Sequence, residues 1–166
     1  MKLLLDSTYL IPALNVDITE GWSKEDLKNL IKSRKYKLYY CDLSLFEIYT
    51  KCMKLILQQK LSITIEEVQN GIQSILNSER LLKINWWEHI FESEILLKLK
   101  ETHNDSIDCM LLYLAIINCD IFATFDEILI NRIKKNKDIQ KFVQDVNPQL
   151  RIWLNDLSED SFNLFE

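Results

Sequence analysis

The chain has 166 residues, of which 48% are hydrophobic and 27% charged, a globular composition with only two glycines and two prolines available for linkers. This length fits one domain over residues 1–166 and leaves little room for two. The net charge of −5 argues against a protein that holds nucleic acid by bulk electrostatics, although a local basic surface is compatible with it.

Cysteine usage and the start of the chain bear on the class of protein. The four cysteines lie in apolar surroundings without CxxC pairing, which favours small buried side chains over zinc ligands or disulfides. They are Cys41, Cys52, Cys109 and Cys119. The first residues lack the long apolar region of a signal peptide, and no apolar run reaches membrane-spanning length. We therefore expect a cytoplasmic protein that does not contact a membrane.

Short apolar runs alternate with helical patterns along the chain. In order, the first half predicts a strand at residues 2–5, helices at 8–14 and 22–35, a strand at 37–41, and helices from 44 to about 59 and around 65–75. The second half predicts a strand at 81–84, helices around 91–99 and at 108–118, a strand at 121–124, a helix after 126 and a strand at 150–154. This alternation predicts an α/β fold, a three-layer α/β/α sandwich with a central, mostly parallel sheet. Residues 156–166 are expected to form an acidic tail that frays or docks its aromatic side chains.

Four acidic residues stand where predicted elements begin or end. Asp6 and Asp126 follow short apolar strands, whereas Glu47 and Asp108 lie in the first turn of apolar helices. In a parallel sheet both positions face the edge where ligands bind. Two carboxylates about 6 Å apart repel by roughly 3 kcal/mol at an effective dielectric constant of about 20, and four acids make six such pairs. A cluster of this kind requires a divalent cation, and oxygen-only ligands favour Mg²⁺ or Mn²⁺.

Helix capping is an alternative explanation for each acid. Ser44-x-x-Glu47 matches the capping box, and Asp105-x-x-Asp108 fits the same arrangement. The acids that follow strands can cap the helices after them. The pattern alone gives capping and a functional role about equal weight for the two helical acids, and what favours function is that all four fall at one predicted edge.

The four acids occur in segments that read LLLDSTYLIPAL, SLFEIYTK, HNDSIDCMLLYLA and IFATFDEIL. As a set, over residues 1 to about 137, these segments resemble the acidic motifs of the PIN-domain family in order and spacing. The resemblance implies a parallel sheet between helices and a Mg²⁺- or Mn²⁺-dependent endoribonuclease, as in the VapC-like toxins of VapBC-type toxin–antitoxin pairs. It also implies which residues are the catalytic, metal-binding acids: Asp6, Glu47, Asp108 and Asp126.

The resemblance implies supporting residues as well. Ser7 matches the small hydroxyl residue after the first acid, and Thr124 matches the hydroxyl residue two positions before the last. Asp105 competes with Asp108 for the third acidic position. We prefer Asp108, because the buried helix of that motif is predicted to start there, and this leaves Asp105 as a cap or an outer acid.

One departure from the family pattern supports other functions. The small residues expected along the third motif are largely replaced by Met110, Leu112 and Tyr113. A PIN-like scaffold that binds proteins and has lost catalysis is therefore an alternative, and a structure-specific DNA nuclease using the same acids is a third. For the ribonuclease, the expected partners are RNA, a second copy of the chain in a homodimer, and an antitoxin protein.

Other residues give weaker signals. Two basic groups can hold RNA phosphates if either borders the acids, although a solvated surface is the commoner explanation of such runs. The residues are Arg34, Lys35 and Lys37 in one group and Arg132, Lys134 and Lys135 in the other. His89 and His103 are too isolated for a histidine-based site, so we expect a turn or surface role for both. Trp86 and Trp87 can stack on bases, but adjacent aromatic residues more often divide between core and interface.

Overall fold

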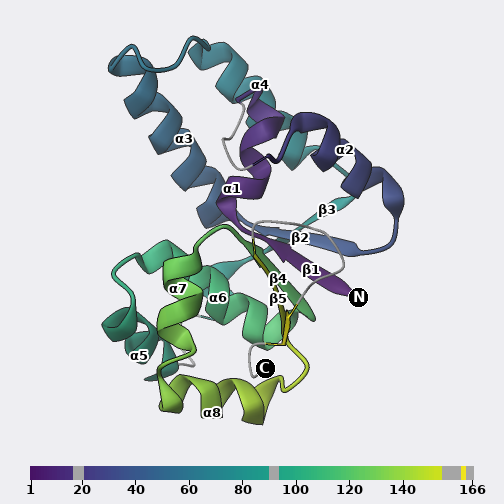
Figure 1. Cartoon of the computed structure of the whole chain (residues 1–166). Helices are drawn as coiled ribbons and strands as arrows, with labels where there is room; N and C mark the ends of the chain where they lie inside the picture. Colours follow the sequence, from purple (N-terminus) through teal and green to yellow (C-terminus); the bar gives the residue numbers. More distant parts are fainter. Residues whose placement is uncertain (17–20, 90–93, 155–161, 164–166) are drawn as a thin grey trace.

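The structure, a computed structural model, describes residues 1–16, 21–89, 94–154 and 162–163. These residues form a six-stranded sheet in the order β3-β2-β1-β4-β5-β6 (Figure 1). The parallel strands are β1 (Lys2–Leu5), β2 (Lys37–Cys41), β3 (Leu81–Ile84), β4 (Ile121–Thr124) and β5 (Arg151–Leu154). The short strand β6 (Phe162–Asn163) is antiparallel to β5 and was not predicted.

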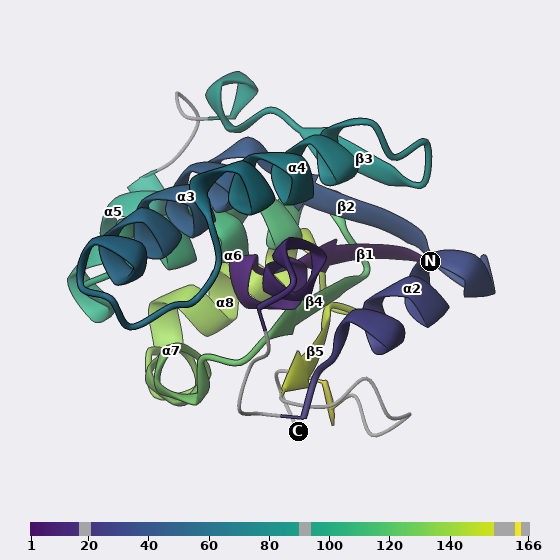
Figure 2. The ribbon, with the colours of Figure 1, turned by 90° about the horizontal axis from the view of Figure 1, so that it is seen from above.

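Helices cover both faces of the sheet, as Figures 1 and 2 show from two directions. One layer contains α1 (Ser7–Leu10), the 3₁₀ helix η1 (Ile11–Leu14), α2 (Lys24–Ser33), α3 (Asp42–Leu57) and α4 (Ile65–Leu76). The other contains α5 (Glu94–Thr102), α6 (Ser106–Asn118), α7 (Glu127–Ile133) and α8 (Lys137–Val146). A second 3₁₀ helix, η2 (Trp86–Glu88), follows β3. The predicted α/β/α sandwich with a mostly parallel sheet is therefore confirmed.

Alternation along β1 divides the interior into two cores. Leu3 and Leu5 pack with the layer of α1 to α4, whereas Leu4 packs with the layer of α5 to α8, and all three side chains are fully buried. A strand in the middle of a parallel sheet is covered on both faces, so an uninterrupted apolar run suits it. This explains why such short sequences form the central strands.

The order of the strands positions the acids. The chain moves from β1 outward to β2 and β3 on one side, and β4 and β5 lie on the other side. The order therefore reverses between β1 and β4, and in open α/β sheets ligands bind outside the carboxyl ends of the strands at such a reversal. Asp6 and Asp126 come just after β1 and β4, so both lie at this point.

Several predicted boundaries are wrong for local reasons. The predicted helix at 8–14 is α-helical only to Leu10 and continues as the tighter η1, which contains Pro12, a residue without a backbone N–H. Asn15, with a φ of 60°, follows the end of η1. The basic segment after β4 forms two helices instead of one, because the Asn136 side chain caps α8. Residue 91, which was expected in a helix, and residues 156–161 and 164–166 of the expected tail lie outside the described part of the chain.

The cysteines and the helices agree with two further expectations. All four cysteines are buried and free, as predicted for small apolar side chains. Within the part of the chain that the structure describes, no helix has the length and apolar character needed to cross a membrane.

Candidate functional site

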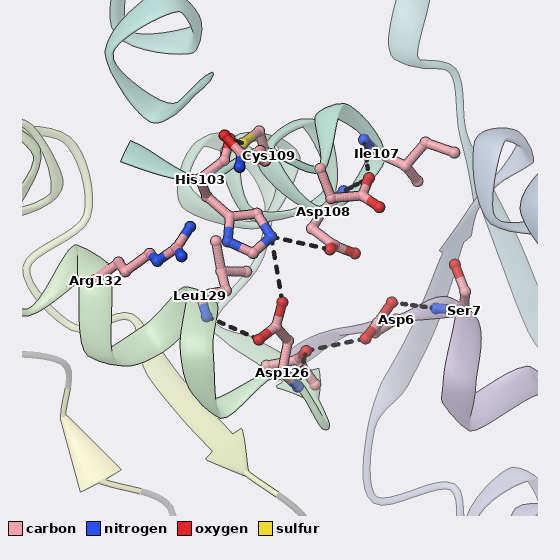
Figure 3. A network of polar contacts seen from close by, with 12 residues as sticks. Asp6, Ser7, His103, Ile107, Asp108, Cys109, Asp126, Leu129 and Arg132 are labelled. Atoms are coloured by element: carbon pink, nitrogen blue, oxygen red, sulfur yellow. Dashed lines mark hydrogen bonds and ion pairs between the residues drawn. The ribbon is translucent and has the colours of Figure 1, made fainter. Parts of the chain in front are cut away.

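The four predicted acids meet near the carboxyl ends of β1 and β4. Asp6 caps α1, Asp126 caps α7, Asp108 lies in the first turn of α6 and Glu47 in the second turn of α3. Ligand oxygens of Asp108 lie within 4.8 Å of one from Glu47 and of one from Asp126. The carboxylates of Asp6, Asp108 and Asp126 face one another (Figure 3). The structure therefore brings together acids that are up to 120 positions apart in the sequence.

Asp6 is one of the two buried acids of the cluster. Its side chain accepts hydrogen bonds from the Ser7 backbone N–H and from Thr124 Oγ1, the latter at 2.9 Å. Burial raises the pKa of Asp6 to about 7, and the negative charge of Asp108 acts in the same direction. These influences outweigh the two hydrogen bonds, which lower the pKa. The negative charge on this carboxylate is therefore unfavourable unless a cation is nearby.

Thr124 also fixes the position of the last acid. Its Oγ1 accepts a hydrogen bond from the Asp126 backbone N–H at 3.0 Å while donating to Asp6. Asp126 Oδ1 accepts a hydrogen bond from the Leu129 N–H at 2.8 Å and so caps α7. Capping was the alternative to a functional role that the sequence analysis gave for this acid. Its second oxygen takes no part in capping, so the capping role leaves it available for another contact.

Glu47 is buried and held by two partners. Ser7 Oγ donates a hydrogen bond to one of its oxygens, and the Lys51 ammonium, one helical turn later, pairs with the other. The capping-box interpretation with Ser44 is wrong, because α3 begins at Asp42 and places Glu47 beyond the first turn. Ser7 therefore contacts two acids of the cluster, Asp6 through its backbone N–H and Glu47 through its hydroxyl.

Lys51 is a member of the cluster that the sequence analysis missed. Burial lowers the pKa of the Lys51 ammonium. The hydrogen bond to Glu47 and the negative charges of Glu47, Asp108 and Asp6 together have a larger effect in the opposite direction, so the pKa is raised overall. Its spacing of four residues from Glu47 is a helical ion-pair pattern that could have identified it. Its side chain remains more than half exposed, so this cation lies at the rim of the cluster.

Asp105 and Asp108 divide the two roles proposed for them. Asp105 is exposed and caps α6, accepting the N–H groups of Ile107 at 2.8 Å and of Asp108 at 3.4 Å. The helix begins at Ser106, two residues earlier than predicted, and Asp108 projects from its first turn toward the other acids. The pKa of Asp108 is raised to about 6, mainly by burial and next by the negative charge of Asp105. The hydrogen bond with His103 lowers the pKa but does not cancel these effects.

His103 contradicts its expected turn or surface role. It is only 7% exposed, and its Nε2 lies 3.2 Å from Asp108 Oδ2 and 3.3 Å from Asp126 Oδ2. Figure 3 shows the edge of the imidazole ring directed at both carboxylates. Asp108 is five residues away in the sequence, but Asp126 becomes a neighbour only because α7 packs against α5, which His103 follows.

The two basic groups lie in different places. Arg34, Lys35 and Lys37 precede or begin β2, so they lie at the amino edge of the sheet, opposite the acids. Arg132 lies beside His103 (Figure 3) and donates to the Thr102 carbonyl at 3.4 Å. In the same group, Lys134 and Lys135 follow the end of α7. Of the two groups, the structure thus places Arg132 beside the cluster.

The adjacent tryptophans divide between core and solvent. Their rings stack with centroids 4.0 Å apart, and Trp86 packs against the core while Trp87 is 58% exposed. They follow β3 at the same edge of the sheet as the acids. The division between core and surface follows the commoner of the two predicted arrangements.

The donor set is suited to a hard or borderline divalent cation. Two groups, Glu47 with Asp105 and Asp108, and His103 with Asp108 and Asp126, each bring three ligand atoms within 4.8 Å of one another. Buried carboxylates with raised pKa values lose their mutual repulsion when a cation binds between them. No protein-family model matches the chain, and no curated protein matches it at a significant level.

Proposed function

We propose that this protein is a PIN-type, metal-dependent endoribonuclease that hydrolyses phosphodiester bonds of RNA. The observation that carries this proposal is that Asp6, Glu47, Asp108 and Asp126, from four separate segments, lie close together where the strand order reverses. Four carboxylates placed there fit the acidic motifs of the PIN family, which the sequence resembles. The burial of Asp6 and Glu47 and the raised pKa values of Asp6 and Asp108 support a role in which a cation provides the missing positive charge.

The residues of the chain have distinct tasks in this proposal. The four acids hold Mg²⁺ or Mn²⁺, which when bound activates water and neutralises charge on the phosphodiester. Ser7 and Thr124 fix the carboxylates of Glu47 and Asp6 through hydrogen bonds. Arg132, which is exposed beside the cluster, contacts a phosphate next to the cleaved bond in this proposal. The enzyme acts without a covalent intermediate, because its nucleophile is water.

The biological setting follows from the family resemblance. A VapC-like toxin is cytoplasmic, acts as a homodimer on RNA and is held inactive by an antitoxin protein. A small reading frame for an antitoxin beside the gene is the observation that would support this setting.

A catalytically silent scaffold is the second candidate, and one observation favours it. The Lys51 ammonium already pairs with Glu47 and so supplies part of the positive charge that a metal ion would bring. In this case, the protein binds other proteins instead of cleaving RNA.

Cleavage assays distinguish these functions. Purified protein with Mn²⁺ is expected to cut single-stranded RNA, and Asp6→Asn is expected to abolish cutting. Asp138→Asn makes the same chemical change on the exposed face of α8 and should leave activity intact. Equal activity of wild type and Asp6→Asn would refute the assignment. Cleavage of flap or single-stranded DNA in preference to RNA would support the DNA nuclease, and the absence of cleavage with all substrates would support the scaffold.

A further inference from the structure

His103 is positioned as a ligand would be. Its Nε2 and the facing oxygens of Asp108 and Asp126 all lie within 4.8 Å of one another, with the two nitrogen–oxygen distances at 3.2 and 3.3 Å. Adjacent ligands of an octahedral ion, each about 2.1 Å from the metal, are separated by about 3 Å. The two distances from Nε2 are therefore close to those between neighbouring ligands on one cation.

The imidazole of His103 can serve the cluster in two ways. A ring that carries a hydrogen on Nε2 donates it to the facing carboxylate oxygens, whereas a neutral ring with its hydrogen on Nδ1 directs the Nε2 lone pair at them, a contact that becomes attractive when a cation lies in between. Among the described residues, the buried Nδ1 atom has no hydrogen-bond partner in either form. The two forms therefore differ at Nε2, and a bound cation selects the second.

We propose that His103 Nε2 binds the same cation as Asp108 and Asp126, and that the site therefore prefers a first-row transition-metal ion such as Mn²⁺ to Mg²⁺. The presence of a cation rests on the proposed function, but the role of His103 does not follow from the four acids. Imidazole nitrogen is a good ligand for first-row transition metals, whereas Mg²⁺ prefers oxygen ligands and retains its water molecules. His103 is thus the residue that determines metal preference.

Pulsed electron paramagnetic resonance of the protein loaded with Mn²⁺ tests this directly. The wild type is expected to show ¹⁴N coupling from a ligated imidazole, and His103→Gln is expected to lose it. His89→Gln, which changes the other histidine of the chain, should keep the coupling. In titrations, His103→Gln should weaken Mn²⁺ binding by at least about tenfold and change Mg²⁺ binding less than about threefold.

The wild-type spectrum alone can overturn the proposal, so the test does not depend on how well the variant folds. Bound Mn²⁺ without ¹⁴N coupling in the wild type would remove His103 from the ligands and leave the ribonuclease proposal intact. Coupling in a protein that does not cleave RNA would support the His103 assignment and refute the ribonuclease. A failure to bind either ion would contradict both proposals.

Discussion

Replacing Asp6 by Asn is expected to stabilise the metal-free protein, by an amount that grows with pH. The Asp6 carboxyl has an ordinary pKa of 3.8 and a folded-state pKa of about 7, raised first by burial and then by the charge of Asp108. Between these two values the folded protein holds a proton that the unfolded chain has released. The stability of the wild type therefore falls as the pH rises through this window, and above pH 7 the loss is complete.

The magnitude follows from the width of the window. Each pH unit corresponds to 1.36 kcal/mol, so the whole interval from 3.8 to about 7 amounts to about 4 kcal/mol. Asparagine stays neutral, and its amide can accept the Ser7 N–H and donate to Thr124 Oγ1. It therefore resembles the protonated acid. The stability advantage of Asp6→Asn should grow by about 3 kcal/mol between pH 5 and pH 8.

Urea unfolding in the presence of EDTA measures this difference at several pH values. Asp138→Asn, whose parent side chain is 72% exposed, controls for the loss of an acid at the surface. Adding Mn²⁺ should reverse the order of stability, because the wild type binds the ion more tightly and binding to the folded state stabilises it. If Asp6→Asn is no more stable than the wild type at pH 8 without metal, the carboxylate ionises at no cost and the reasoning is wrong.

Three further variants test separate parts of the structure. Asp105→Ala should lower the free energy of unfolding by about 1 kcal/mol through loss of the α6 cap, and Asp105→Asn should restore it; an equal loss in both would contradict the capping role. Gly71→Ala should destabilise by about 1–3 kcal/mol in urea unfolding, because its Cβ would lie 2.7 Å from Leu14 Cα, and a gain would show that η1 packs less closely on α4. Lys51→Met should tighten Mn²⁺ binding about three- to tenfold in calorimetry by removing the cation paired with Glu47, whereas weaker binding would make Lys51 a support of the site.

The strands and the acids that follow them could be predicted from the sequence because both depend on local patterns. An apolar run of four residues can satisfy burial on two faces only in the middle of a sheet, so residues 2–5 and 121–124 were placed correctly. The prediction that Asp6 and Asp126 share an edge then required only that β1 and β4 be parallel. Their adjacency in the sheet was not encoded locally, and the strand order supplied it.

The parts of the site that were missed depend on contacts between elements. His103 ends up beside Asp126 because α6 and α7 pack on the same face of the sheet, and no pattern around residue 103 announces this. Glu47 is the reverse case, since a good local motif with Ser44 made capping an equally weighted alternative, which the earlier start of α3 rules out. The position of Arg34 could have been inferred, because a residue that precedes a strand lies at its amino end.

The most direct test of the central claim is the anomalous signal of Mn²⁺ in crystals of the wild-type protein. We expect an anomalous difference peak about 2.2 Å from carboxylate oxygens of Asp6, Asp108 and Asp126, the distance of a directly bound ion. A crystal saturated with Mn²⁺ that shows no peak between these carboxylates would contradict the claim that they form a metal site.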